Sequence, residues 1–203
     1  MNRLRVFFLS IVLLSGMSNC AFAQTSEMIL NDTTFIYRSM EEALANPTKV
    51  FRLNLSRHKL DSVPEAIYTF TNLIELDLSR NKIQEVSEKI GDLVHLEKLN
   101  LANNELVHVP AEIGNLHELK YLGLNRNILE DLPSTIGDLQ SLETLELWDN
   151  ELKDIPDEIS KLQNLKEIEL RGILFTEEQQ KRIDELVVRT AKIYFSPPCN
   201  CKY

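Results

Sequence analysis

The sequence predicts an α/β fold in which short parallel strands, one from each of about six repeated units, stack into a curved solenoid. Leucines recur with a period of 23 residues between positions 50 and about 175. Within each unit, the spacing leucine-x-leucine is that of a strand whose alternate side chains enter a core. The second halves of the units carry a recurring proline, a recurring glycine or both, residues that suit turns and short helices.

The first half of each unit follows the pattern Leu-x-x-Leu-x-Leu-x-x-Asn-x-Leu. One complete copy consists of Leu96, Leu99, Leu101, Asn104 and Leu106. His58 replaces the asparagine in the first unit, and Ile173 replaces it in the last. Because one unit cannot bury its apolar face alone, neighbouring units must stack. Departures in the terminal units are expected, since terminal repeats are atypical.

The second half of the unit also recurs, with one gap. A hydrophobic residue and a proline stand at Val63-Pro64, Val109-Pro110, Leu132-Pro133 and Ile155-Pro156, whereas Val86-Ser87 lacks the proline. Proline has no N–H, so it suits the irregular side of the solenoid better than the sheet. Gly91, Gly114 and Gly137 stand where we expect a short helix to end or turn.

These repeats resemble the leucine-rich-repeat superfamily, in the 23-residue class that includes Ras-group repeats, disease-resistance-like repeats and many exported bacterial proteins. The resemblance covers residues 50 to about 175. It implies a parallel sheet on the concave side, and short helices and turns on the convex side. It also implies a ladder of the repeat asparagines that satisfies the backbone where the chain turns.

The segments that flank the repeats are predicted to be helical caps. Ser39-Met40-Glu41-Glu42 is a capping-box pattern, and Asn46-Pro47 ends the helix that follows it. Thr176 begins a second helix, and Ile193-Tyr194-Phe195 is a candidate last strand. We therefore divide the chain into a signal peptide (1–23), an N-terminal flank (24–49), the repeats (50–175) and a C-terminal cap and tail (176–203).

The N-terminus is typical of a secretory signal peptide. Arg3 and Arg5 precede an apolar run, and Ala21-Phe22-Ala23 predicts cleavage after Ala23. A less favoured alternative is a lipoprotein signal with a lipid anchor at Cys20, where Asn19 departs from the usual small residue. We expect an exported protein, periplasmic, surface-bound or secreted, and no other segment is apolar enough to span a bilayer.

Charge and cysteine content narrow the classes of partner. Loss of the two signal-peptide arginines would move the net charge from −9 to −11, which argues against binding nucleic acid or anionic lipid. Cys199 and Cys201 could form a strained disulfide, pair with another chain, or remain tail residues without a role. Two thiols are too few for a closed zinc site, and we expect no metal or cofactor.

The candidate binding site lies on the concave face, where strand residues between the leucines form four columns. The candidate partner-binding residues are Arg57, Arg80, Tyr121, Asn125, Arg126, Glu146, Trp148 and Asp149. We expect Tyr121 and Trp148 to be close neighbours, with a dip at Gly123 between them. Trp and Tyr dominate binding hot spots. The alternative is that Trp148 packs flat on the sheet without a ligand.

Charge on this face is expected to be polarised. Arg57, Arg80 and Arg126 share a column, and acidic residues gather toward the last repeats. The acidic residues are Glu146, Asp149, Glu167 and Glu169. Such a face would steer a partner of matching polarity, and the alternative is a solvated surface of mutually paired charges.

The leading functional hypothesis is a module that binds a protein or peptide. A structural or adhesive role at the cell surface, through weak multivalent contacts or tail disulfides, is the first alternative, and an effector enzyme is the remote one. We expect no catalysis, because the four histidines stand at unlike repeat positions and no nucleophile, phosphate-loop or metalloprotease motif is present.

Overall fold

The computed structural model describes residues 33–196. The predicted signal peptide, the alternative lipid-attachment residue Cys20 and the tail residues Cys199 and Cys201 lie outside the described residues. Within residues 33–196, no helix combines the length and apolar character needed to cross a membrane.

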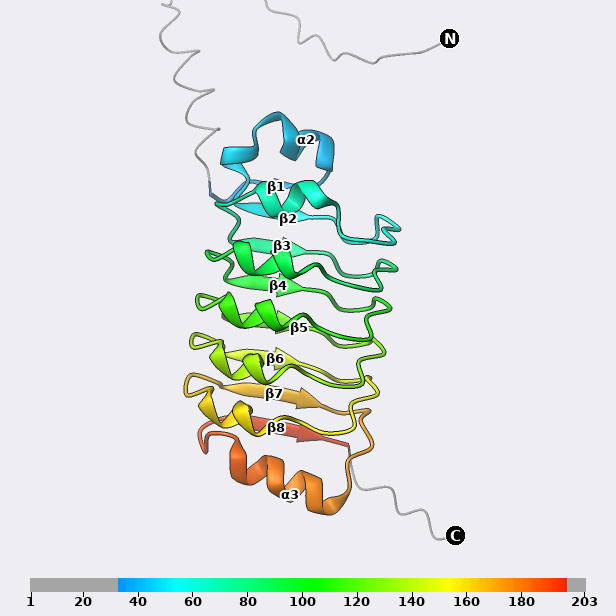
Figure 1. Ribbon diagram of the computed structural model, residues 1–203, viewed down its shortest axis with the longest axis vertical. Coiled ribbons are helices and arrows are strands. Elements are labelled where there is room, and N and C mark those ends of the chain that lie inside the picture. Colours follow the sequence, from blue (N-terminus) through cyan, green and yellow to red (C-terminus); the bar gives the residue numbers. More distant parts are fainter. Residues whose placement is uncertain (1–32, 197–203) are drawn as a thin grey trace, which may run out of the picture. The chain divides into compact units, whose positions relative to one another are not determined.

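Eight parallel strands form one sheet, in which each strand pairs with its neighbours in sequence order (Figure 1). From β2 to β7, paired residues are one repeat apart, as Arg52 is from Glu75. One repeat therefore makes one turn, and the predicted α/β solenoid is confirmed. The strands are β1 (Ile36–Tyr37), β2 (Arg52–Asn54), β3 (Glu75–Asp77), β4 (Lys98–Asn100), β5 (Tyr121–Gly123), β6 (Thr144–Glu146), β7 (Glu167–Leu170) and β8 (Lys192–Phe195).

Short 3-10 helices occupy the second halves of the repeats, where short helices were expected. Pro110, Pro133 and Pro156 immediately precede three of them, with φ between −65° and −67°. Proline is favoured there because its fixed φ suits the start of a helix and its missing N–H is not needed. The 3-10 helices are η1 (Pro47–Lys49), η2 (Glu65–Thr69), η3 (Glu88–Asp92), η4 (Ala111–Asn115), η5 (Ser134–Asp138) and η6 (Asp157–Lys161).

The repeat leucines fill one continuous core. Leu76, Leu99, Leu122 and Leu145 stand at the middle of successive strands and are at most 1% exposed. Ile113 of η4 belongs to the same buried cluster. Because burying one such side chain stabilises a fold by about 1.5–3 kcal/mol, the leucine period accounts for the stacking of the turns.

The predicted asparagine ladder is present. The side-chain amide of Asn127 donates to the carbonyl oxygens of Leu101 (3.1 Å) and Leu124 (2.8 Å), and its Oδ1 accepts the N–H of Leu106 at 3.1 Å. The same three bonds are made by Asn81, Asn104 and Asn150. Each amide thus satisfies backbone groups that strand pairing leaves open.

The repeat glycines stand near the ends of short helices, as expected, and also serve the packing between repeats. Gly91, Gly114 and Gly137 lie inside 3-10 helices, and Gly172 is the glycine with positive φ among the described residues. A Cβ on Gly114 would lie 2.7 Å from the carbonyl oxygen of Thr135 in the next repeat. Each of these three glycines is the last residue but one of its 3-10 helix, as the expectation of a helix end required. Their lack of a side chain also lets neighbouring 3-10 helices pack closely.

A helix closes each end of the stack (Figure 1). In α2 (Met40–Ala45), the Ser39 side chain accepts the N–H of Glu42 at 3.2 Å, as the capping pattern predicted. In α3 (Glu177–Leu186), Thr176 and Gln179 form a complete capping box. Ile183 of α3 is fully buried, so this helix covers the last turn of the core.

Candidate partner-binding face

The strand face is the surface of polar residues that alternate with the buried leucines, and it comprises three columns of side chains. The sheet register sets residues one repeat apart side by side. The first column is Arg52, Glu75, Lys98, Tyr121, Thr144 and Glu167. The second is Asn54, Asp77, Asn100, Gly123, Glu146 and Glu169. The third is Ser56, Ser79, Ala102, Asn125, Trp148 and Arg171.

Several side chains of the second column stabilise the turn that leaves each strand. The Oδ1 atoms of Asn54, Asp77 and Asn100 accept the backbone N–H two residues later, at 3.0, 2.9 and 3.1 Å. Asparagine and aspartate commonly make this local bond in turns. Part of the polarity of the strand face therefore serves the fold.

The Tyr121 side chain occupies the space above Gly123. A Cβ on Gly123 would lie 2.8 Å from the Tyr121 hydroxyl oxygen. That hydroxyl donates to Oε2 of Glu146 at 2.9 Å, and Nζ of Lys98 lies 5.2 Å from the ring centroid. Burial raises the pKa of Tyr121, and the negative charge of Glu146 adds to the rise. The predicted dip at Gly123 was wrong, because the tyrosine ring fills it.

Trp148 is half-buried and carries a stacked cation. The guanidinium carbon of Arg126 is 4.7 Å from the Trp148 ring centroid, and Nε of Arg126 is 3.6 Å from Oδ2 of Asp149. A cation–π contact at an exposed site contributes about 0.5–1 kcal/mol. Tyr121 pairs with Thr144 in the register. Trp148 follows β6, which ends at Glu146, the residue that accepts the Tyr121 hydroxyl. That Tyr121 and Trp148 are close neighbours therefore stays a prediction.

Asn125 neighbours Trp148 in the third column and holds an unsatisfied acceptor. Its side chain is buried, at 5% exposure, and its Oδ1 atom has no hydrogen-bond partner within the described residues. A buried polar atom without a partner costs on the order of 1–3 kcal/mol. The strand face is therefore incompletely satisfied beside the only tryptophan of the chain.

The predicted fourth column lies outside the strands. Its residues have positive φ of 54–61° at the five non-glycine positions and 77° at the glycine. They are Arg57, Arg80, Asn103, Arg126, Asp149 and Gly172. Our placement of this column on the strands was wrong, because each residue forms the left-handed turn that follows a strand. The third column also lies just beyond the strand ends, directly before this turn. The Arg57 and Arg80 side chains are exposed there and make no hydrogen bond or ion pair within residues 33–196.

The acidic residues near the last repeats are partly paired within the chain. Glu169 is 6% exposed and accepts from Nε and Nη2 of Arg171 at 2.7 and 2.6 Å. These bonds raise the pKa of Arg171. Glu146 and Asp149 are engaged by the Tyr121 hydroxyl and by Arg126. Two of the four predicted acidic residues, Asp149 and Glu169, are thus ion-paired. Glu146 bonds to an uncharged hydroxyl, and the Glu167 side chain has no partner within residues 33–196, so the negative end of the predicted charge pattern is only partly neutralised.

The sheet continues one strand beyond the columns that the repeat predicts. Tyr194 of β8 pairs with Glu169 in the register, and Arg171 lies over its ring with 5.8 Å to the centroid. The tyrosine was visible in the sequence within a candidate strand, but that strand follows a helix and keeps no 23-residue spacing. Its register could therefore not be assigned in advance.

The described residues include no group of three or more His, Cys, Asp or Glu side chains that could hold a metal ion. His95 and His108 each face one carboxylate of the next repeat, Glu118 at 3.5 Å and Asp131 at 3.1 Å. All four side chains are more than half exposed. Such surface pairs contribute at most about 1 kcal/mol, so they act as contacts between turns.

Two family models for leucine-rich repeats match the repeats of this chain. A family model described as leucine rich repeat matches residues 48–106 and 71–129. A second model, described as leucine-rich repeat region, matches residues 108–177. No curated protein matches the sequence.

Solved structures share the fold. A leucine-rich-repeat protein of Leptospira interrogans is 31% identical, with a TM-score of 0.64 over 81% of this chain and 49% of its own. The crystal structure of PEPR1–AtPEP1 is 30% identical, with a TM-score of 0.63 over 76% and 22%. Internalin C2 of Listeria monocytogenes is 25% identical, with a TM-score of 0.66 over 78% and 66%. This chain therefore spans about half of the Leptospira protein and less of PEPR1–AtPEP1.

Proposed function

The chain belongs to the leucine-rich-repeat superfamily, and on this premise we propose that it is an exported module that binds a protein or peptide through its strand face. The observation that carries the proposal is the Arg126–Trp148 stack next to the unsatisfied Oδ1 of Asn125. Tryptophan, tyrosine and arginine dominate binding hot spots. A buried hydrogen-bond acceptor without a donor, in an otherwise regular repeat, is typical of a functional site.

Charge and similarity support the same function. Arg57 and Arg80 present two guanidinium groups without partners in the described chain, which would favour a partner that carries carboxylates. One similar structure contains both PEPR1 and AtPEP1, and another is an internalin. Repeat solenoids commonly use their extended sheet surface for binding, and the side chains of the strand face differ from repeat to repeat.

The test compares the full mature chain with two variants. Trp148→Ala should weaken binding of the captured partner about 30-fold or more, the loss typical of a hot-spot residue. Leu174→Ala is the matched control, because Leu174 is 88% exposed and lies outside the strand face. Partners are captured from the envelope and medium of the producing cell and their affinities measured by calorimetry. Wild-type affinity in a folded Trp148→Ala chain would overturn the proposal.

Export rests on Arg3, Arg5 and the Ala21-Phe22-Ala23 segment. The mature protein should begin at Gln24, as measured by intact mass and N-terminal sequencing. A lipidated N-terminus at Cys20 would instead support the alternative lipid anchor, and an intact Met1 in the cytosol would contradict export.

A further inference from the structure

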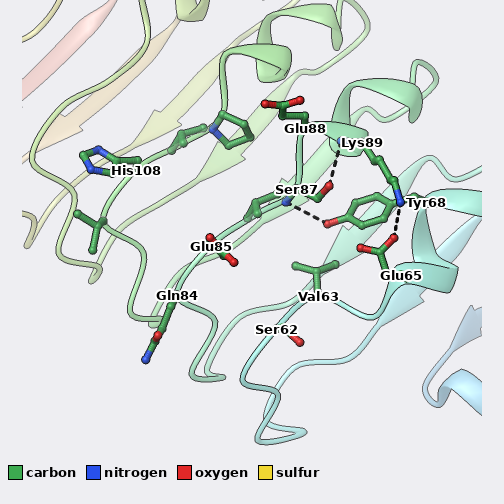
Figure 2. A pocket seen from close by; sticks show the side chains of 14 residues that line it. Ser62, Val63, Glu65, Tyr68, Gln84, Glu85, Ser87, Glu88, Lys89 and His108 are labelled. Carbon is green, nitrogen blue, oxygen red and sulfur yellow. Dashed lines mark hydrogen bonds and ion pairs between the residues drawn. The ribbon is translucent and has the colours of Figure 1, made fainter.

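A cleft of about 910 Å³ opens on the flank of the solenoid, away from the strand face (Figure 2). Three consecutive repeats line it. Val63, Val86 and Val109 occupy equivalent positions in those repeats, and Tyr68 and His108 complete much of the wall. Its volume lies within the range of small-ligand sites.

Two departures from the repeat produce this cleft. Tyr68 stands where the following repeats have Gly91, Gly114 and Gly137, and Ser87 stands where other repeats have proline. The Ser87 N–H, which a proline would lack, donates to the Tyr68 hydroxyl at 3.3 Å. Because the tyrosine ring takes the place of a hydrogen atom, η2 and η3 pack less closely than the later 3-10 helices.

The far end of the same flank shows what this surface can bind. Arg182 of α3 donates from its guanidinium to the carboxylates of Asp154 and Asp157. It also donates to the carbonyl oxygen of Ile155 at 2.8 Å. Two carboxylates and one carbonyl around a planar, five-donor cation form a well-matched guanidinium site.

The same three groups recur in the second repeat, three turns earlier. Glu85 is equivalent to Asp154, the Val86 carbonyl to that of Ile155, and Glu88 to Asp157. Among the described repeats, these two hold both acids. The equivalent pairs elsewhere are Ser62 and Glu65, His108 and Ala111, and Asp131 and Ser134.

The second copy has no cation within the described residues. Glu85 and Glu88 are exposed and form no hydrogen bond or ion pair there. Figure 2 shows them on either side of Ser87 on the cleft wall. The nearby ammonium of Lys89 is held by Glu65 at 2.6 Å. The cleft thus carries three carboxylates against one ammonium, a balance that favours a further cation.

We propose that Glu85, the Val86 carbonyl and Glu88 bind an arginine side chain of a partner polypeptide at this cleft, as Asp154, Ile155 and Asp157 bind Arg182. Val63, Tyr68, Val86 and Val109 line the cleft with only 7–8% of their surfaces exposed, which leaves a narrow apolar strip for the aliphatic stem of the arginine. The site lies on a different surface from the strand face. A failure of this proposal would therefore leave the proposed binding of a partner at the strand face unaffected, and the reverse also holds.

The test is a titration of the ¹⁵N-labelled mature chain with N-acetyl-arginine amide, followed by ¹H–¹⁵N NMR. Saturable shifts are expected at the amides of residues 85–89, with an affinity at least about fivefold tighter than for N-acetyl-lysine amide, since a planar fork matches two carboxylates better than a point charge. Glu85→Gln/Glu88→Gln should abolish the shifts. Glu151→Gln/Glu185→Gln removes two exposed charges elsewhere and should retain them.

An Arg182→Ala chain supplies an internal reference, because it frees the Asp154–Asp157 site for the same probe. Shifts at residues 154–157 of that chain without shifts at 85–89 would overturn the proposal, and so would the absence of shifts at both sites. Equal affinity for the lysine and arginine probes, or an equal response to Ca²⁺, would replace the arginine site with a nonspecific cation site. If Arg182→Ala loosens the capping helix α3, the titration of the wild-type chain still tests whether Glu85 and Glu88 bind the arginine probe.

Discussion

The asparagine ladder and the strand face repeat with the same period, but they differ in how completely their polar groups find hydrogen-bond partners within the chain. Each of Asn81, Asn104, Asn127 and Asn150 makes the same three hydrogen bonds to backbone groups. On the strand face, Asn54, Asp77 and Asn100 share one local turn bond, whereas the other side-chain contacts differ between repeats. Asn125 has an acceptor without a donor among the described residues. Positions that stay constant therefore build the solenoid, and positions that change are available to specify a partner.

The largest effect is expected in the ladder. Asn127→Ala would leave two carbonyls and one N–H buried without their amide partner, and should lower the free energy of unfolding by about 3 kcal/mol. Urea denaturation followed by circular dichroism measures the change. Asn115→Ala, at an exposed asparagine, is the control and should change stability by less than about 0.5 kcal/mol. If Asn127→Ala lowers the free energy of unfolding by less than about 1 kcal/mol, the ladder does not stabilise the solenoid in the way that separates it from the strand face.

Two glycine substitutions compare the packed flank of the solenoid with its strand face. Gly114→Ala would press a Cβ against the Thr135 carbonyl oxygen and should cost about 2 kcal/mol, since backbone cannot move aside easily. Gly123→Ala meets the end of the Tyr121 side chain, which can rotate away, so it should cost less than about 1 kcal/mol. Thermal unfolding ranks the two variants. The reverse order would contradict the idea that the strand face tolerates change better than the packed flank.

Sequence reasoning predicted the fold because the fold depends on positions that repeat. Leu99, Leu122 and Leu145 have the same environment in each turn, and so do the ladder asparagines, so one copy explains all of them. The capping patterns at Ser39 and Thr176 were also sufficient, because a cap is formed by residues within one turn of each other.

The site was harder to predict because it depends on single side chains. Nothing in Arg57 or Arg126 indicates a left-handed backbone, which glycine or asparagine would have suggested. The ring of Tyr121 lies over Gly123 through its side-chain rotamer, which strand alternation does not determine. Tyr68 in a glycine position and Ser87 in a proline position were visible departures, but the cleft they produce depends on packing between neighbouring turns.

A pH titration tests the buried hydroxyl on the strand face. The folded pKa of Tyr121 is raised above the unfolded value of about 10. The stabilisation of the folded state by the protonated Tyr121 is therefore fully present below about pH 10 and is lost as pH rises toward the folded pKa. Tyr121→Phe should make the alkaline decline in unfolding free energy shallower, measured by urea denaturation between about pH 8 and 11. Tyr68, whose pKa is also raised by burial, keeps its own share of the decline, so an identical pH dependence in Tyr121→Phe would show that Tyr121 is not buried.

The smallest effect is expected at the left-handed turn. Arg80 has φ of 59° and no side-chain partner within residues 33–196. Arg80→Gly relieves a strain of about 1–2 kcal/mol but adds backbone entropy to the unfolded chain, so the net gain should be about 0.5 kcal/mol. Arg126→Gly gains less, because it also removes the stack on Trp148. A clear loss of stability in Arg80→Gly would show that its side chain serves the fold.

The fluorescence of Trp148 tests the central claim most directly, because it is the only tryptophan of the chain and lies on the strand face. Acrylamide quenching is measured for the mature wild-type chain alone and saturated with a captured partner that itself lacks tryptophan or carries a non-fluorescent analogue. If the strand face binds the partner, the quenching constant of Trp148 falls and its emission shifts to shorter wavelength. Unchanged quenching and emission in the saturated complex would contradict the claim.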